Sequence, residues 1–589
     1  MTRAIALAAP VFFSASLAAG QAVTVVPLPD AGINSIIIQG PDTLTTFGGS
    51  QLLPTPPRDG RPPATGSSRL AGTVRAAGSG QPLRGALVRI TSAELGESRS
   101  SSTDTAGRYE FRDLPAGKYT IGAQKGGYVS VSWGQKRLSS VPDPGRPFPL
   151  GERHNAENVD FVLPRGGVIT GRVVDELGEP VPDATVQVLR SQFVQGQRRL
   201  LPGGRMDQTN DIGEFRLFGL SPGQYFLSAM LRSIVPVAET SLDRIGYATT
   251  YYPGTTELGS AQRLAVGPGD TVSGIEVQLV ATRTARISGT AMDSTGRPLS
   301  GGGVSLLPRG AALTFGGGGG PVRSDGSFFL TGVPPGQYLL RASGPPRGIG
   351  LPPEVSTASV DVSGEDITGV VLTPVTPVDV AGRVVVLDPS AAAALQPSAI
   401  RLALQPMSPG EMAAGPGAPP PALKEDFTFA TKASPGRLLV RATVGSPGWV
   451  IKSVRAGGVD VTDSGLEIRP SQGIDDLEVE LTNRAPQVSG VVTTDRGEGA
   501  AQSYALFFSQ DRRLWTVPTG RYTLLSRAGD DGRYTARALP PGDYYAIGLE
   551  FVDQTSYGDP DFLETLRSHA VPVTLLDGDT RTLDLRLSR

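Results

Sequence analysis

The chain has 589 residues, of which 76 are glycine, 51 are proline and none is cysteine. This length predicts several domains, and so much glycine and proline excludes helix-rich domains and favours short strands joined by turns. The 54 basic and 56 acidic residues nearly balance, so the charge gives no reason to expect nucleic acid or an anionic membrane as a partner. Without cysteine, disulfides and thiolate metal sites are excluded.

The first 20 residues have the pattern of a secretory signal. Arg3 precedes an apolar run over residues 4–17, and small residues follow at 18–20. The run is short and weakly apolar for a membrane helix, although a helix retained as an anchor is the alternative. We therefore expect an exported protein, periplasmic, on the outer surface or extracellular, with no membrane insertion after signal removal. Residues 21–68 are rich in proline and glycine and predict an extended linker.

One block of sequence recurs along the chain. Its first copy, from Asp104 to Tyr119, has a polar turn ending in glycine, an alternating apolar strand, a Leu-Pro-x-Gly turn and a second strand opening with tyrosine. Period-two alternation places one face of a strand on a core. Proline followed by glycine predicts a turn with the glycine in the left-handed position. Further copies contain Gly213, Gly326 and Gly532, and a degenerate copy spans residues 427–438.

An opening strand with the pattern apolar-x-Gly-x-Val, or Ala in place of Val, precedes each block. Its glycines divide the chain into five units of domain size: Gly72, Gly171, Gly289, Gly382 and Gly490. Each unit closes with another alternating strand, and the strand spacing is that of a sandwich. We therefore predict an all-β chain, a tandem array of about five Ig-like β-sandwich domains.

The predicted sandwiches span residues 69–164, 165–281, 282–375, 376–483 and 484–589, the fourth being degenerate. A short helix is predicted in the last of them, over residues 559–569, where acidic residues precede an apolar pattern of helical spacing.

These motifs resemble the carboxypeptidase regulatory-like family of bacterial secreted proteins. The resemblance rests on Ile169-Thr-Gly171-Arg-Val-Val-Asp175 with the strand that follows it, and on the Gly…Phe…Leu-x-Pro-Gly-x-Tyr block. The fourth unit departs from it, because it lacks the hairpin glycine and the tyrosine. The resemblance implies a transthyretin-like (prealbumin-like) sandwich, grouped with carbohydrate-binding-like folds. In peptidases that carry this module, the chemistry lies elsewhere.

No residue pattern predicts catalysis, a cofactor or a metal site. His154 and Glu157 have His-x-x-Glu spacing, but zinc needs a third ligand, and the other histidine is His569 in a different unit. We interpret the pair as part of an exposed junction and expect no enzyme. Asp460 and Asp463 suggest calcium, but their spacing also fits turns that hold no ion.

Aromatic residues follow the Pro-Gly-Tyr strand in the first two units: Tyr128, Trp133, Tyr247, Tyr251 and Tyr252. Exposed aromatic platforms hold sugar rings or peptides, whereas the alternative is that these loops cap the core. Strand alternation predicts that Tyr247 and Tyr251 face one side and Tyr252 the other.

These features give a hypothesis of a non-enzymatic protein that binds polysaccharide or another cell-envelope polymer or protein, with the five aromatic residues as the candidate platform. One alternative is a structural spacer or adhesin arm. Another is an accessory to an outer-membrane transporter or peptidase. The sequence leaves the oligomeric state open.

Overall fold

The computed structural model describes residues 36–40, 43–47, 65–135, 138, 145–231, 245–309, 318–345, 353–386, 392, 395–407, 420–445, 448–553 and 556–588. The predicted signal lies outside these residues. The chain divides into two compact units, residues 1–61 and residues 62–589. In the first unit, β1 (Ile36–Gly40) pairs in antiparallel with β2 (Thr43–Phe47). The second unit contains the β-sandwiches.

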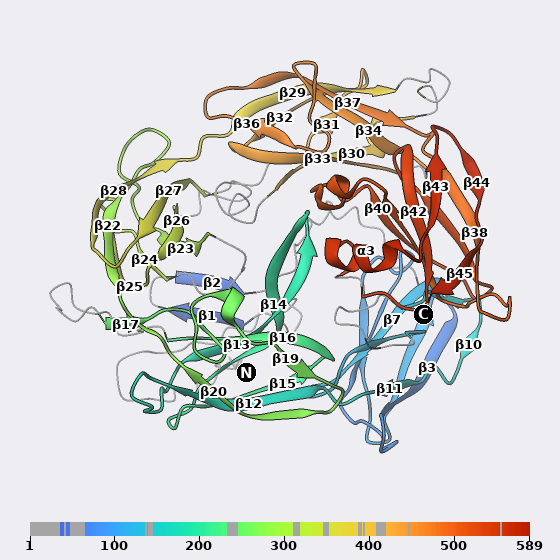
Figure 1. Ribbon diagram of the computed structural model, residues 1–589, viewed down its shortest axis with the longest axis horizontal. Helices are drawn as coiled ribbons and strands as arrows, with labels where there is room; N and C mark the ends of the chain where they lie inside the picture. The colour runs from blue at the N-terminus through green and yellow to red at the C-terminus, as the bar shows by residue number, and fades with distance from the viewer. Residues whose placement is uncertain are drawn as a thin grey trace, which may run out of the picture. The chain divides into compact units, whose positions relative to one another are not determined.

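Strands dominate the second unit, and the fold is the predicted all-β array of sandwiches (Figure 1). The first sandwich comprises β3 (Ser68–Ala76), β4 (Leu87–Thr91), β5 (Arg99–Ser102), β6 (Arg108–Leu114), β7 (Gly117–Gln124), β8 (Val131–Ser132), β9 (Phe148–Leu150), β10 (Asn155–Ala156) and β11 (Phe161–Leu163). The second comprises β12 (Gly167–Val174), β13 (Thr185–Val194), β14 (Gln197–Gln208), β15 (Glu214–Leu220), β16 (Gly223–Met230), β17 (Ile245–Tyr247), β18 (Thr250–Tyr251), the 3-10 turn η1 (Leu258–Ser260), β19 (Leu264–Val266), β20 (Thr271–Gln278) and β21 (Ala281–Arg283).

The remaining three sandwiches follow in chain order. The third comprises β22 (Ala285–Ala291), β23 (Gly303–Pro308), β24 (Gly319–Pro321), β25 (Ser327–Val333), β26 (Gly336–Ser343), β27 (Val355–Val362) and β28 (Ile367–Pro374). The fourth comprises β29 (Val378–Val386), η2 (Pro397–Ala399), β30 (Ile400–Pro406), β31 (Ala422–Leu423), β32 (Thr428–Ala433), β33 (Gly436–Val444), β34 (Val450–Ala456), β35 (Val459–Asp460), β36 (Leu466–Ile468) and β37 (Ile474–Thr482). The fifth comprises β38 (Gln487–Thr493), β39 (Tyr504–Ser509), η3 (Arg512–Thr516), β40 (Thr523–Arg527), β41 (Arg533–Arg537), β42 (Gly542–Leu549), α3 (Pro560–Arg567), β43 (Val571–Leu575), β44 (Thr580–Thr582) and β45 (Leu585–Ser588).

The five sandwiches share one pairing scheme. The opening strand, for example β12, pairs in antiparallel with the hairpin strand of the repeated block, β15, and in parallel with the closing strand, β20. The same triplet recurs as β3–β6–β11, β22–β25–β28, β29–β32–β37 and β38–β41–β45. The second layer is built on the pairs β4–β7, β13–β16, β23–β26, β30–β33 and β39–β42. Each sandwich encloses its own hydrophobic core.

A close backbone contact explains the glycine of the opening strand. A Cβ atom on Gly171 would lie 1.9 Å from the carbonyl oxygen of Ile275 in the closing strand. The pairing register shifts at this point, which is the signature of a β-bulge that presses one backbone on the other. Gly289 and Gly382 have the same separation from the carbonyls of Val370 and Leu477.

The tyrosine of the repeated block closes the Leu-Pro-x-Gly turn with its hydroxyl group. Each of the four tyrosines donates to the carbonyl oxygen four residues earlier, for instance Tyr119 to Pro115 at 2.6 Å and Tyr544 to Pro540 at 2.8 Å. Tyr225 and Tyr338 make the same bond. The four rings are buried in their cores. The aromatic residue therefore fills the core with its ring and fixes the turn with its hydroxyl.

In three copies the glycine of this turn has a positive φ, as predicted, although not the value of the left-handed helix. Gly223 has a φ of 151°, and Gly336 and Gly542 have 154°, a range that favours glycine. The residues with φ typical of the left-handed helix precede the leucine or valine of the turn: Asp113 at 56°, Gly219 at 75°, Gly332 at 65° and Ala538 at 75°. Asp113, Gly219 and Gly332 lie within β6, β15 and β25, where the pairing register shifts. The chain reverses after these strands, in the short segment that contains the proline.

The fourth sandwich keeps the hairpin turn without its glycine. Phe427 takes the glycine position with a φ of 63°. Its amide donates to the Lys424 carbonyl at 3.0 Å, as the Gly213 amide does to Asn210. Phe427 also packs against the fourth core, and this contact offsets the backbone strain.

The predicted helix is α3. The side chain of Asp559 accepts a hydrogen bond from the amide of Asp561, which caps the helix N-terminus. Leu563 is fully buried in a cluster with Phe508 and Ile547, which lie on β39 and β42. The helix therefore covers the face of this sheet that is turned away from the fifth core (Figure 1).

Candidate binding site

The structure places Tyr128 and Trp133, the first two predicted platform residues, against the first core. The ring of Trp133 makes edge contacts with Phe148 and Phe161, with centroids 5.5 and 6.1 Å apart. Both side chains are half-buried.

The three tyrosines of the second sandwich are also half-buried, but their sides differ from the prediction. Tyr247 and Tyr252 pack together against the second core, whereas Tyr251 packs on the cluster of Leu189, Leu200 and Phe226. The assignment by alternation was wrong because the residues between β17 and β18 are not in a strand, so the parity is lost. Burial, with a hydrogen bond from the Tyr247 hydroxyl to Glu176 at 2.9 Å, raises the pKa of Tyr247 to about 12.

The residues considered for metal binding have other partners. Glu157 forms an ion pair with Arg69 at 2.9 Å, and the exposed His154 meets neighbours through its backbone. The Asp460 carboxylate accepts a hydrogen bond from the Thr462 amide at 2.9 Å. In the part of the chain that the structure describes, no three histidine or acidic side chains gather as metal ligands. Among those same residues, no helix combines the length and apolar character needed to cross a bilayer.

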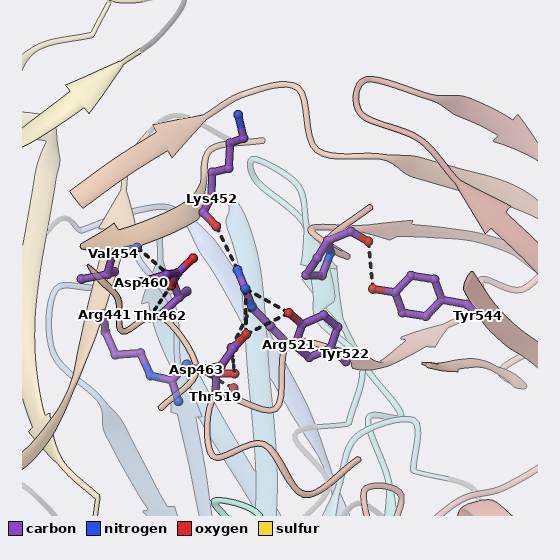
Figure 2. Close-up of polar contacts among 11 residues, drawn as sticks. Arg441, Lys452, Val454, Asp460, Thr462, Asp463, Thr519, Arg521, Tyr522 and Tyr544 are labelled. Carbon is purple, nitrogen blue, oxygen red and sulfur yellow. Dashed lines mark hydrogen bonds and ion pairs between the residues drawn. The ribbon is translucent and has the colours of Figure 1, made fainter. Parts of the chain in front are cut away.

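A polar network joins the fourth sandwich to the fifth (Figure 2). Arg521 binds the Asp463 carboxylate with Nε and Nη2, at 2.9 and 2.8 Å, and its Nη1 donates to the carbonyl of Lys452 at 3.1 Å. The hydroxyls of Thr519 and Tyr522 donate to the same carboxylate at 2.7 and 2.8 Å. Asp463 therefore accepts four hydrogen bonds from the fifth sandwich.

A cavity of about 250 Å³ lies beside this network. The fourth sandwich contributes Arg441 on β33, Trp449 just before β34, and Lys452 on β34. The fifth sandwich contributes Arg521 and residues 538–541, which include the leucine and both prolines of the repeated turn. The cavity thus joins an aromatic ring, apolar turn residues and three cationic side chains.

A second cavity of about 240 Å³ adjoins the first. The two share Trp449, Lys452, Thr482 and Asp577 as lining residues, and the second adds Arg484. We call the two cavities together the junction groove. Trp449 lines both parts, so one ring is available along the groove.

The cations of the groove differ in their partners. Lys452 pairs with Glu480 at 3.1 Å, and Arg521 pairs with Asp463. Arg441 donates from Nη1 to the carbonyl of Thr519 at 3.2 Å, and no carboxylate among the described residues pairs with its guanidinium. Burial lowers the pKa of Arg441 from its ordinary value.

Sequence reasoning did not select any residue of the junction groove. Trp449 was visible as one of three tryptophans in the chain, in the unit that departs most from the repeat. Trp449 also packs against the fourth core, so its presence in the sequence did not by itself mark a site.

A comparison with models of known protein families gives a match within the first sandwich. The model of the carboxypeptidase regulatory-like domain matches residues 69–140. No curated protein sequence matches the chain.

Among solved structures, the Bacillus anthracis TIE protein is similar at 14% identity, over 68% of this chain and 69% of that one, with a TM-score of 0.15. The streptococcal ancillary pilin has 15% identity over 52% and 99%, with a TM-score of 0.17. GBS52, the minor pilin of Streptococcus agalactiae, has 13% identity over 36% and 97%, with a TM-score of 0.21. The family match coincides with strands β3 to β8 of the first sandwich. Residues 69–140 are therefore similar to the carboxypeptidase regulatory-like domain.

Proposed function

We propose that the chain is an exported, non-enzymatic surface protein that binds a carbohydrate polymer of a cell envelope. The single observation that supports this most strongly is the junction groove, where the half-buried Trp449, which also packs against the fourth core, lines two adjoining cavities. A flat aromatic face is suited to stack on a sugar ring, and polar side chains around it orient hydroxyl groups.

The size of the groove favours a chain of small units. Pockets for drug-sized ligands enclose roughly 300–1,000 Å³, and each cavity here, at about 250 and 240 Å³, is smaller. Because the cavities adjoin and share Trp449, successive units of one polymer fit better than a single large molecule. Single sites of this kind bind weakly, so a polymer with many copies of the unit gains by avidity.

The second candidate function is a structural spacer or adhesin arm. The fixed junction between the fourth and fifth sandwiches favours it, because the bidentate Arg521–Asp463 pair holds two domains in one orientation. A spacer needs such a junction but has no use for a tryptophan-lined groove.

Affinity electrophoresis in gels that contain soluble plant or bacterial polysaccharides tests the proposal. The full chain should be retarded by at least one polymer, and Trp449→Ala should lose most of that retardation. Tyr251→Ala is the matched aromatic control from the originally predicted platform, and it should migrate as the parent does. If no polymer retards the parent, the spacer function is favoured. If Tyr251→Ala abolishes retardation and Trp449→Ala does not, the tyrosines of the second sandwich form the site.

A further inference from the structure

Arg441 is a half-buried cation that faces the first cavity without a carboxylate partner. The other two cations that line this cavity have carboxylate partners, because Arg521 pairs with Asp463 and Lys452 pairs with Glu480. The Thr519 carbonyl, its hydrogen-bond partner, is neutral. A guanidinium taken partly out of water loses hydration that a carbonyl replaces only in part. An anionic group in the cavity would restore that loss.

The second cavity repeats this arrangement with Arg484. This side chain is exposed and lines the cavity next to Trp449. Among the described residues, no acidic side chain forms an ion pair with it. Each half of the groove therefore presents one guanidinium that pairs with no carboxylate among the described residues, and Trp449 lines both halves.

The one acidic residue that lines the groove without an ion pair among the described residues is Asp577, which is exposed and borders both cavities. Its charge opposes an anionic ligand, but exposed charges are screened by water and salt more than half-buried ones. The two guanidinium groups outnumber it, so the local balance still favours a negative ligand.

Resting on the proposed function, we infer that the junction groove binds an acidic polysaccharide whose sugar units carry carboxylate groups, with Arg441 and Arg484 each binding one carboxylate. A planar carboxylate matches the two-donor edge of a guanidinium. A polymer of uronic acids supplies carboxylates at a regular repeat and sugar rings between them for Trp449.

Comparing two forms of one polymer distinguishes recognition of the carboxylate charge from recognition of the sugar ring. De-esterified polygalacturonate carries a carboxylate on each unit, and its fully methyl-esterified form has the same backbone without the charge. Isothermal titration of the full chain with matched oligomers of both should show about tenfold tighter binding of the acid, as expected when a partly buried charge pair forms. The preference should fall as salt is added.

Variants at the two arginines test how much each contributes to the preference for the acid over the ester. Arg484→Gln should reduce the preference for the acid about threefold or more, and Arg441→Gln should remove most of it. Arg441→Lys keeps the charge and should retain part of the preference, which separates charge recognition from misfolding. Arg496→Gln, an exposed arginine on a turn of the fifth sandwich away from the groove, is the matched control and should behave as the parent.

The outcomes distinguish this inference from the proposed function. Equal binding of acid and ester, with both lost in Trp449→Ala, would overturn the carboxylate assignment and leave carbohydrate binding intact. An acid preference that survives in both glutamine variants would also overturn it. If the parent binds neither oligomer, nor any polymer in the gel experiment, the proposed function fails as well.

Discussion

Arg521 and Asp463, 58 residues apart in the chain, hold the fourth and fifth sandwiches together through two parallel charge-assisted hydrogen bonds. Their side chains are only 22% and 26% exposed, so water screens the pair less than it screens a surface ion pair. The same contact brings the wall that contains Arg521 against the wall that contains Arg441 and Trp449. The junction groove therefore depends on this pair.

Asp463→Asn should destabilise the junction by about 2 kcal/mol, because it leaves Arg521 partly buried without a counter-charge. Urea unfolding of the full chain, followed by an optical probe, measures the change in the free energy of unfolding. Glu276→Gln breaks the more exposed Arg172–Glu276 pair and should cost about 0.5 kcal/mol. Equal effects of the two changes would show that the junction pair adds nothing beyond a surface contact.

Gly171→Ala should destabilise the second sandwich by about 3 kcal/mol or more, because the added methyl group overlaps the Ile275 carbonyl and the strands must separate. Gly178→Ala provides the comparison. That glycine has a φ of 84° and nothing within 4 Å of an added Cβ, so only backbone strain of about 1–2 kcal/mol is expected. Thermal unfolding measures both, and a milder effect at Gly171 than at Gly178 would contradict the close contact.

Tyr225→Phe should cost more than Tyr338→Phe. Both tyrosines donate to a turn carbonyl, but the Tyr225 hydroxyl also accepts a hydrogen bond from the buried Arg190. Loss of the turn bond alone should cost about 1 kcal/mol, and loss of the bond to a cation should add about 1.5 kcal/mol. Chemical denaturation of the two variants gives the difference, and identical midpoints would show that Arg190 does not depend on the hydroxyl.

The stability of the first sandwich should fall in acid through Glu110. Hydrogen bonds from Arg112 and Arg69, with their positive charges, lower the pKa of Glu110 to about 2 from 4.5. Because the folded-state pKa is the lower one, this contribution is complete above about pH 4.5 and is lost as the pH falls toward 2. Unfolding of the parent and of Glu110→Gln across this range measures it. The variant should show a weaker decline, and parallel curves would exclude a role for Glu110.

The repeat made most of the fold predictable. Alternating residues such as Phe215 and Leu217 gave the strands, and the acidic cap at Asp559 gave the helix. The domain boundaries stay predictions. The repeated pattern also showed that the opening strand contains a glycine at a fixed position. It did not show why glycine is needed there, because the contact between Gly171 and Ile275 joins segments about a hundred residues apart.

The junction groove could not be predicted from the sequence for a related reason. Arg441 and Trp449 belong to one sandwich, whereas Arg521 and the turn at 538–541 belong to the next. Periodicity within a strand tells which face a residue takes, but not which face of another domain it meets. The prediction of which sides the tyrosines face was wrong for a different reason. The residues between Tyr247 and Thr250 are not in a strand, so the alternation stops there.

Hydrogen–deuterium exchange of the full chain, with and without an oligomer of galacturonic acid, tests whether the ligand binds in the junction groove. The oligomer should slow exchange in residues 448–452, 482–485 and 537–542, which contain lining residues of the junction groove, and should leave residues 245–255 unchanged. Protection confined to residues 245–255, or no protection anywhere at saturating oligomer, would contradict binding in the junction groove.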